Sequence, residues 1–183
     1  MIGIREEDTE KVQFINDVFD ELLPGSKTSE YPLTSGKKAW CGAFVYEVLT
    51  KTDLLNTIAE DKDKPNSSVA YDRVRALDYL DVGKEVTTPK VGDVIVVSKM
   101  IGNKRQHHVA FYAGENDNGN IIILGGNQGY KGTGGEINFK ALDDKFTIHG
   151  YRRMENMTDI KQATVLSYRN KYGVIGGKKG TLI

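Results

Sequence analysis

The chain is poor in cysteine. Its 183 residues include one, Cys41, so no disulfide can form within the chain. This cysteine usage fits a protein that folds in a reducing cytoplasm. The length is sufficient for one domain whose hydrophobic core needs no covalent cross-link.

An excess of charge of either sign is also missing. The sequence has 25 Lys and Arg residues and 25 Asp and Glu residues. A chain without net positive charge has no global basic field to attract nucleic acid or anionic wall polymers. We therefore expect no nucleic-acid partner, although a local basic patch is compatible with this balance.

Long hydrophobic runs are absent, and no stretch is long enough to span a bilayer. The first eight residues, Met1 to Asp8, are charged and lack the apolar region of a Sec signal peptide. We therefore expect synthesis in the cytoplasm without a Sec signal, and no membrane insertion. The sequence also shows no internal repeat.

The spacings typical of zinc sites, CxxC, HxxxH and HExxH, do not occur. Cys41, Asp93, His107 and His108 can be combined on paper into a ligand set. However, adjacent histidines point to opposite faces of a strand. The sequence therefore predicts no metal and no cofactor.

The hydrophobic pattern changes along the chain from helical to strand-like. Helical spacing is found at 12–22 (ended by Pro24-Gly25), after Cys41, and at Ala70, Val74 and Leu77. Strands are predicted at 94–97, 108–113, 121–124 and 146–151, with Asn-, Asp- and Gly-rich turns between them. Helices followed by antiparallel strands indicate an α+β fold.

The C-terminal part of the chain is predicted to be an appendage. A helix is expected at 158–169, and the ending Gly176-Gly177-Lys178-Lys179-Gly180 is typical of a flexible basic tail. We therefore divide the chain into a domain of residues 1–157 and a C-terminal helix and tail of residues 158–183.

Cys41 begins a predicted helix, and His108 lies in a predicted strand. A helix N-terminus and a nearby imidazole are the two features that hold a cysteine as a nucleophilic thiolate. The alternative is structural, because a single cysteine is most often a small buried hydrophobic residue. A strand histidine, including the late His149, is likewise usually structural.

Four motifs occur in an order that resembles one family: Trp40-Cys41-Gly42-Ala43-Phe44-Val45, Pro89-Lys90-Val91-Gly92-Asp93-Val94, His108-Val109-Ala110-Phe111-Tyr112 and Leu124-Gly125-Gly126-Asn127-Gln128. They are similar to the papain-like cysteine hydrolases of bacterial cell walls, the NlpC and CHAP group, and most to a small bacterial and phage subfamily. The resemblance covers roughly residues 35–154. It implies a papain-like fold in which N-terminal helices, with the catalytic cysteine at a helix N-terminus, pack on a mainly antiparallel sheet.

The resemblance also implies roles for individual residues. Cys41 would be the nucleophile, and His108, directly before Val109, the general base and acid. Asn127 would orient the imidazole, with Gln128 as the second choice. The backbone N–H of Cys41 would donate to the oxyanion. Further candidates are Tyr31 and Gln106 for a second oxyanion donor, Trp40 and Gly126 for the substrate cleft, and His107 for the rim or back of the sheet.

The function implied is hydrolysis of amide bonds in peptidoglycan stem peptides through an acyl-thioester intermediate. An endopeptidase is the leading interpretation, and an N-acetylmuramoyl-L-alanine amidase with the same residues is the alternative. A non-catalytic virion or wall-binding module on the same scaffold stays open. Without a Sec signal, such a protein would reach the wall by holin release, virion delivery or injection. Its partner beyond the stem peptide would be an immunity protein or a virion component.

Overall fold

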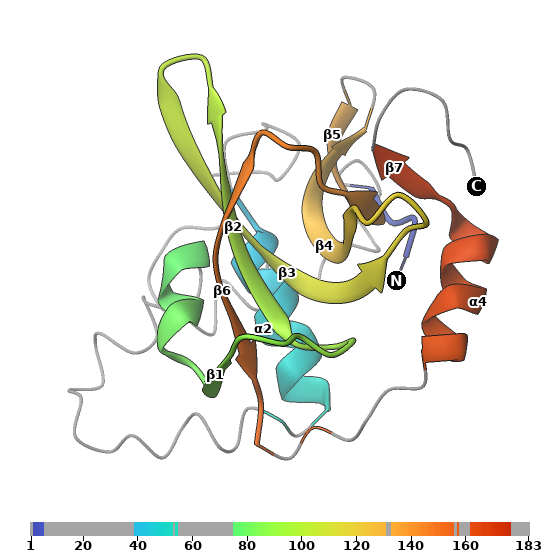
Figure 1. Cartoon of the computed structure of the whole chain (residues 1–183). Helices are drawn as coiled ribbons and strands as arrows, with labels where there is room; N and C mark the ends of the chain where they lie inside the picture. The colour runs from blue at the N-terminus through green and yellow to red at the C-terminus, as the bar shows by residue number, and fades with distance from the viewer. Residues whose placement is uncertain are drawn as a thin grey trace.

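Figure 1 shows a computed structural model of the chain as an α+β structure with one sheet and few helices. The structure describes residues 2–5, 39–52, 54, 75–130, 133–155, 157 and 162–176. The predicted helix at 12–22, Tyr31, residues 66–74 and the tail at 177–183 lie outside the described residues.

The described elements follow one another in a helix-then-strand order. They are α2 (Cys41–Lys51), the 3-10 helix η3 (Ala76–Asp81), β1 (Lys84–Val86), β2 (Val94–Ile101), β3 (Lys104–Glu115), β4 (Ile121–Tyr130), β5 (Thr133–Ala141), β6 (Phe146–Arg153), α4 (Gln162–Tyr172) and β7 (Val174–Gly176).

The seven strands form one sheet in the order β1-β6-β2-β3-β4-β5-β7. All neighbours are antiparallel except β5 and β7, which are parallel. The predicted α+β class is therefore confirmed, with a mainly antiparallel sheet.

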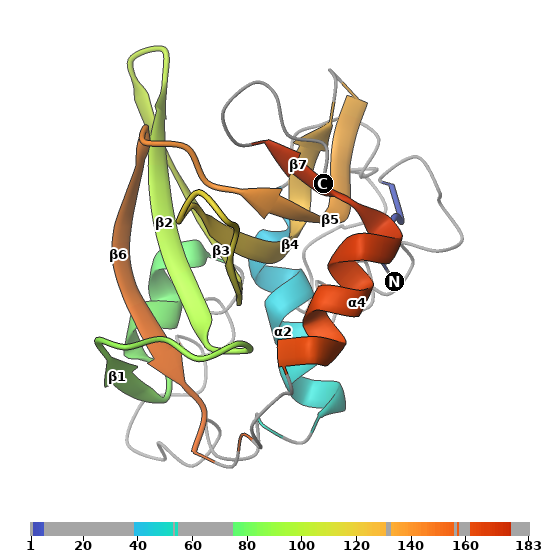
Figure 2. The same ribbon diagram turned by 45° about the vertical axis from the view of Figure 1, so that its right-hand side comes forward.

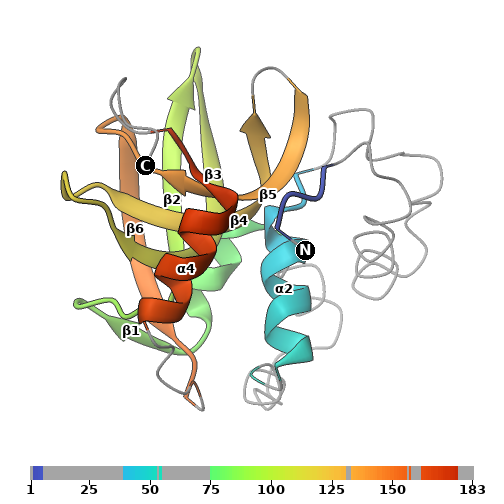
Figure 3. The ribbon, with the colours of Figure 1, turned by 90° about the vertical axis from the view of Figure 1, so that its right-hand side faces the viewer.

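The helix predicted after Cys41 is present as α2, and its apolar stripe explains its position. Phe44, Val45 and Leu49 are buried in a core cluster with Val96, Val109 and other sheet residues. Helical spacing of these side chains places them on one face, which packs on the sheet. Figures 2 and 3 show α2 on one side of the sheet, with β4 and β5 curving toward its N-terminal end.

The strands are longer than the sequence predicted. β2 and β3 continue through the polar segment 99–106 as a hairpin that projects beyond the rest of the sheet (Figure 1). Gly102, with a φ of 58°, takes the left-handed conformation that its turn requires. Residues 99–106 are therefore strand ends and a tight turn, and Met100 and Ile101 near the tip are exposed.

The prediction that the strand ends in a turn after residue 124 is wrong, because β4 continues to Tyr130. The Gly-Gly-Asn-Gln-Gly run pairs with β5 through a bulge between Gly125 and Gln128. Asn127 has a φ of 56°, a conformation that Asn accepts more readily than most residues. The glycines that indicated a turn in the sequence instead permit a bulged strand.

The C-terminal residues 162–176 contact the sheet through α4 and extend it by one strand, β7. β7 pairs with β5, and Val165 and Val174 pack against a cluster formed by Ala113, Ile122, Phe139 and Ala141. The predicted helix at 158–169 is described as α4, shifted to Gln162–Tyr172. Within the described ranges, no helix is long and apolar enough to cross a membrane.

The Pro89–Val94 motif has a structural role in the fold. Asp93 is fully buried, and both of its carboxylate oxygens accept from Arg153 of β6, at 2.9 Å from Nε and 2.7 Å from Nη2. The backbone N–H of Lys90 donates to the same carboxylate at 2.7 Å. This bidentate pair links the turn before β2 to the end of β6.

Candidate active site

Cys41 is the first residue of α2, and its side chain meets β3. The residue is only 3% exposed. Backbone N–H groups of Val109, Gly42 and Cys41 itself lower the pKa of the thiol, but burial raises it more, so the net pKa lies above the ordinary value. Burial therefore favours the protonated thiol over the thiolate in this structure.

The N–H of Val109 faces the side of β3 away from β2. Tyr112 donates its N–H to Asp93 on the β2 side at 2.7 Å, and N–H groups alternate sides along a strand. Pairing between β3 and β4 runs only from Phe111 and Leu124 to Glu115 and Ile121. At Val109, one residue after His108, β3 is no longer paired with β4, and the thiol of Cys41 lies against the free side of the strand.

The first turn of α2 provides further backbone donors. Trp40, the N-cap residue, makes no side-chain capping hydrogen bond, so its side chain does not occupy the first-turn N–H groups. The Gly42 carbonyl accepts from Tyr79 of η3 at 2.7 Å, which anchors the turn. Backbone donors at a helix N-terminus can stabilise negative charge that develops beside Cys41.

His108 is a neutral imidazole at pH 7. Its pKa is lowered to about 4, mainly because the ring is buried and secondly because of the positive charge of Lys140. The neighbouring Gln128 side chain raises the pKa and partly offsets these effects. Nε2 of the ring lies close to Gly125, 3.0 Å from where a Cβ on that glycine would be, so Gly125 leaves space for the imidazole.

The orientation of the Gln128 amide is determined by its own contacts. Its Nε2 lies among three acceptors, the Gly125 carbonyl (3.1 Å), the Asn138 carbonyl (2.6 Å) and Asn138 Oδ1 (3.0 Å). Rotating the amide by 180° would place its oxygen against these acceptors, so Nε2 must face them. Oε1 is left to face His108, whose buried Nε2 also has no well-aligned partner among the described residues.

Asn127 has different neighbours from Gln128. A Cβ on Gly135 would collide with Asn127 Oδ1 and would lie 3.1 Å from Trp40 Nε1, so Asn127 lies with Gly135 and Trp40. Adjacent strand residues point to opposite faces, and the bulge turns Gln128 toward the imidazole. Gln128, the second choice from sequence, is thus the residue that the structure brings to His108.

The two predicted cleft residues pack against each other. Trp40 is fully buried, and a Cβ on Gly126 would collide with its ring and lie 2.7 Å from Phe44 Cβ. Both therefore contribute to the packing of β4 on α2. Gln106 is an exposed residue of β3 paired with Lys99, and Tyr31 lies outside the described part of the chain.

His107 points to the face of β3 opposite to His108, as predicted for neighbouring strand residues. Its ring lies 5.4 Å from that of His149 on β6.

Sequence reasoning missed the contribution of Asn138, because no strand was predicted at β5. No three His, Cys, Asp or Glu side chains form a potential metal-binding group within the described residues.

The buried imidazole makes stability depend on pH. In the unfolded chain His108 binds a proton near pH 6.5, whereas in the folded protein it does so only near pH 4. Between these values the unfolded state binds more protons, so stability decreases as the pH falls. We expect the unfolding free energy to decrease by about 2 kcal/mol from pH 7 to 4.5 through this group.

Urea unfolding at the two pH values measures this change. The His108→Gln variant, which has no titrating group at this position, should lose correspondingly less stability on acidification. An equal acid-induced loss in wild type and variant would contradict a neutral buried His108.

The arrangement places a thiol, a neutral imidazole and an amide oxygen around the point where β3 and β4 separate. A thiol, an imidazole and an amide are the groups that a cysteine–histidine mechanism uses. Comparison of the chain with family models, with curated proteins and with solved structures finds no match.

Proposed function

We propose that this protein is a papain-like cysteine hydrolase that cleaves amide bonds in the stem peptides of bacterial peptidoglycan. The single observation that carries the chemistry is the position of the Cys41 thiol, at a helix N-terminus and against the backbone next to His108, whose Nε2 faces Gln128. The substrate class rests on the resemblance of the four motifs to cell-wall hydrolases of the NlpC and CHAP group.

The protonation states favour a general-base mechanism. We assign the ring proton to Nε2, the nitrogen that lies beside the Gln128 side chain at Gly125, so that Nδ1 of His108 takes the thiol proton as Sγ attacks the carbonyl carbon. The imidazolium then protonates the leaving amine, which leaves a thioester on Cys41. Water, deprotonated by the same ring, hydrolyses the thioester and regenerates the thiol. Backbone N–H groups of the first turn of α2 stabilise the oxyanion.

One observation favours the non-catalytic alternative. A thiol that is 3% exposed and has a raised pKa is also typical of a structural cysteine. A structural cysteine alone would not require Gln128 to lie beside His108. Burying these two polar side chains in the core costs free energy, so their presence favours a functional role. We therefore place hydrolysis first and retain a wall-binding module as the second function.

Digestion of purified sacculi tests both functions. Wild-type protein should release soluble fragments, and Cys41→Ala should release none. Mass spectrometry of the fragments identifies the bond: an endopeptidase leaves L-alanine attached to muramic acid, whereas an amidase releases peptides with a free L-alanine N-terminus. Binding to sacculi without release by wild-type protein would support the wall-binding module.

Gln128 is expected to be more important than Asn127 for turnover. Gln128→Ala removes the group that holds the imidazole, and we expect a loss in kcat on the order of a hundredfold, as for a misplaced catalytic group. Asn127→Gly retains the left-handed backbone and should change kcat little. The pKa of His108, measured by NMR, should fall further in Gln128→Ala, since the Gln128 side chain that raises it is lost. A larger kcat loss in Asn127→Gly than in Gln128→Ala would support Asn127, the first choice from sequence, as the residue that orients the imidazole.

A further inference from the structure

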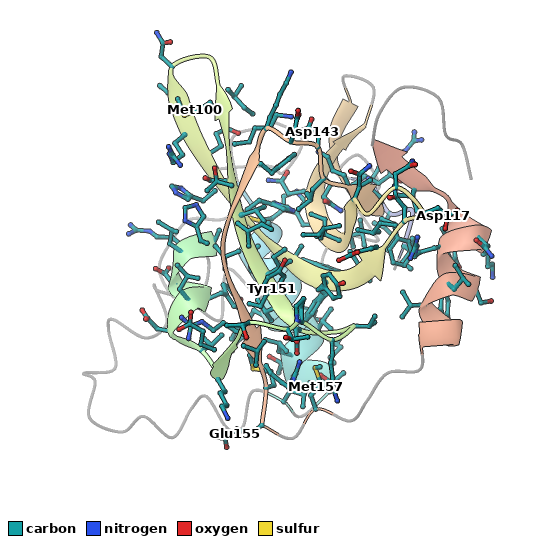
Figure 4. All side chains as sticks on the ribbon, viewed as in Figure 1. Met100, Asp117, Asp143, Tyr151, Glu155 and Met157 are labelled. Atoms are coloured by element: carbon teal, nitrogen blue, oxygen red, sulfur yellow. The ribbon has the colours of Figure 1, made fainter. Side chains whose placement is uncertain are left out.

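Four polar side chains gather at the outer part of the β2–β3 hairpin and the adjacent β6. They are Ser98 on β2, Arg105 and His107 on β3, and His149 on β6. Met100, labelled in Figure 4, marks the projecting end of this hairpin. The catalytic proposal uses none of these side chains.

The strand register explains how they come together. Ser98 pairs with His107, and Met100 pairs with Arg105, so alternate residues of the hairpin share one face. β6 pairs Gly150 with Val96 and Ile148 with Val97, which leaves His149 as an extra residue in a bulge. Bulges of this kind redirect a side chain, and here the redirected side chain reaches Ser98.

The contacts centre on the Ser98 hydroxyl, in a residue that is only 1% exposed. Oγ lies 2.8 Å from His149 Nε2 and accepts from Arg105 Nη1 at 3.3 Å. The rings of His107 and His149 lie 5.4 Å apart at an angle of 48°. A buried hydroxyl thus holds two hydrogen-bonding side chains in place, and a second histidine lies beside them.

The strand segments that carry this cluster bear charge of one sign, whereas η3, which packs against β2, β3 and β6, carries Asp78 and Asp81. The pKa of His149 is lowered by burial first and then by the positive charges of His107 and Arg105. The sequence segments that carry these residues, 94–114 and 145–154, contain no Asp or Glu. Three groups that repel one another when protonated would be stabilised by a bound anion.

The cluster is also close to the proposed nucleophile. His107 precedes by two residues Val109, whose N–H contacts the Cys41 thiol. Two residues of extended strand span about 7 Å. A peptide whose scissile carbonyl lies at Cys41 could therefore place an acidic group one residue away at the cluster.

We propose that Arg105, His107 and His149, held by Ser98, form a subsite for a carboxylate of the substrate, so that the protein selects stem peptides with a free carboxyl group over their amidated forms. This inference rests on the proposed function and adds the substrate class to it. Arg105 and the histidines supply N–H donors to a carboxylate, whereas a carboxamide presents its own N–H groups to them.

A pair of peptides tests the preference. One is N-acetyl-L-Ala-γ-D-Glu-L-Lys with a free α-carboxyl group on its D-Glu residue, and the other is the same peptide with a carboxamide at that position. Titration into the Cys41→Ala protein, followed by the ring ¹⁵N NMR signals of His107 and His149, should show at least about tenfold tighter binding of the carboxylate form. Arg105→Gln should remove this preference. Lys104→Gln, which removes a neighbouring exposed cation, should retain it.

The binding measurement needs no turnover, so its result is separate from that of the sacculus digestion. Equal binding of the two peptides, or a preference that survives in Arg105→Gln, would overturn the subsite. Inorganic phosphate serves as a third probe, and tighter binding of phosphate than of the carboxylate peptide would overturn the assignment to a carboxylate. Failure of wild-type protein to digest sacculi, with the peptide preference intact, would reject the proposed function and keep the anion site.

Discussion

Replacement of Cys41 by alanine is expected to reduce wall hydrolysis at least about a thousandfold, because the proposed thioester cannot form without the thiol. The variant should still fold, since alanine occupies less space in the same core position, with a cost of about 1–2 kcal/mol. Fragment release from sacculi measures the activity, and circular dichroism with thermal unfolding measures the fold. Cys41→Ser, which is nearly isosteric, should be equally inactive and more stable.

Alkylation provides a second measurement of the same thiol. Iodoacetamide should inactivate the wild-type protein with one equivalent bound, because Cys41 is the only cysteine. The raised pKa makes the reaction slow at neutral pH and faster with each unit of increasing pH, as the thiolate fraction grows. Full activity in Cys41→Ala would reject the cysteine mechanism, and inactivation by EDTA with rescue by zinc would indicate the metal alternative.

The second large effect is expected at His108. His108→Ala should lower kcat by about a hundredfold to ten-thousandfold, the usual contribution of general acid–base catalysis. His107→Ala is the matched comparison, since the neighbouring ring points to the other face of β3 and transfers no proton in the mechanism. Its kcat on an amidated peptide should stay within about tenfold of that of the wild type.

The acid limb of the pH profile should follow the same residue. As the pH falls through about 4, His108 becomes protonated and can no longer accept the thiol proton, so kcat/KM decreases. The apparent pKa belongs to the coupled thiol and imidazole. A greater loss in His107→Ala than in His108→Ala would show that the proton acceptor lies on the other face of the strand.

Local sequence pattern was enough to predict the elements that carry the proposed nucleophile and the proposed base. The apolar spacing after Cys41 predicted α2, and the alternation after His108 predicted β3, because each pattern reports which side chains of one element face the core. The opposite directions of His107 and His108 followed from the same alternation. These predictions hold because they depend on residues adjacent in the chain.

Other features depended on contacts between distant segments. The choice between Asn127 and Gln128 required the bulge in β4 and the acceptors of Asn138 on β5. The glycines around these residues are equally compatible with a turn or a bulged strand, and only pairing with β5 decides between them.

The sequence by itself determined the α+β class, the helix that begins at Cys41 and the strand that carries His108, because these follow from local periodicity and composition. Only the tertiary structure decided the protonation of the pair and the grouping of Ser98, Arg105 and His149. Burial raises the pKa of the thiol and lowers that of the imidazole, and burial is a property of the packed sheet and helix. The grouping at Ser98 likewise required a bulge in β6, about fifty residues further along the chain.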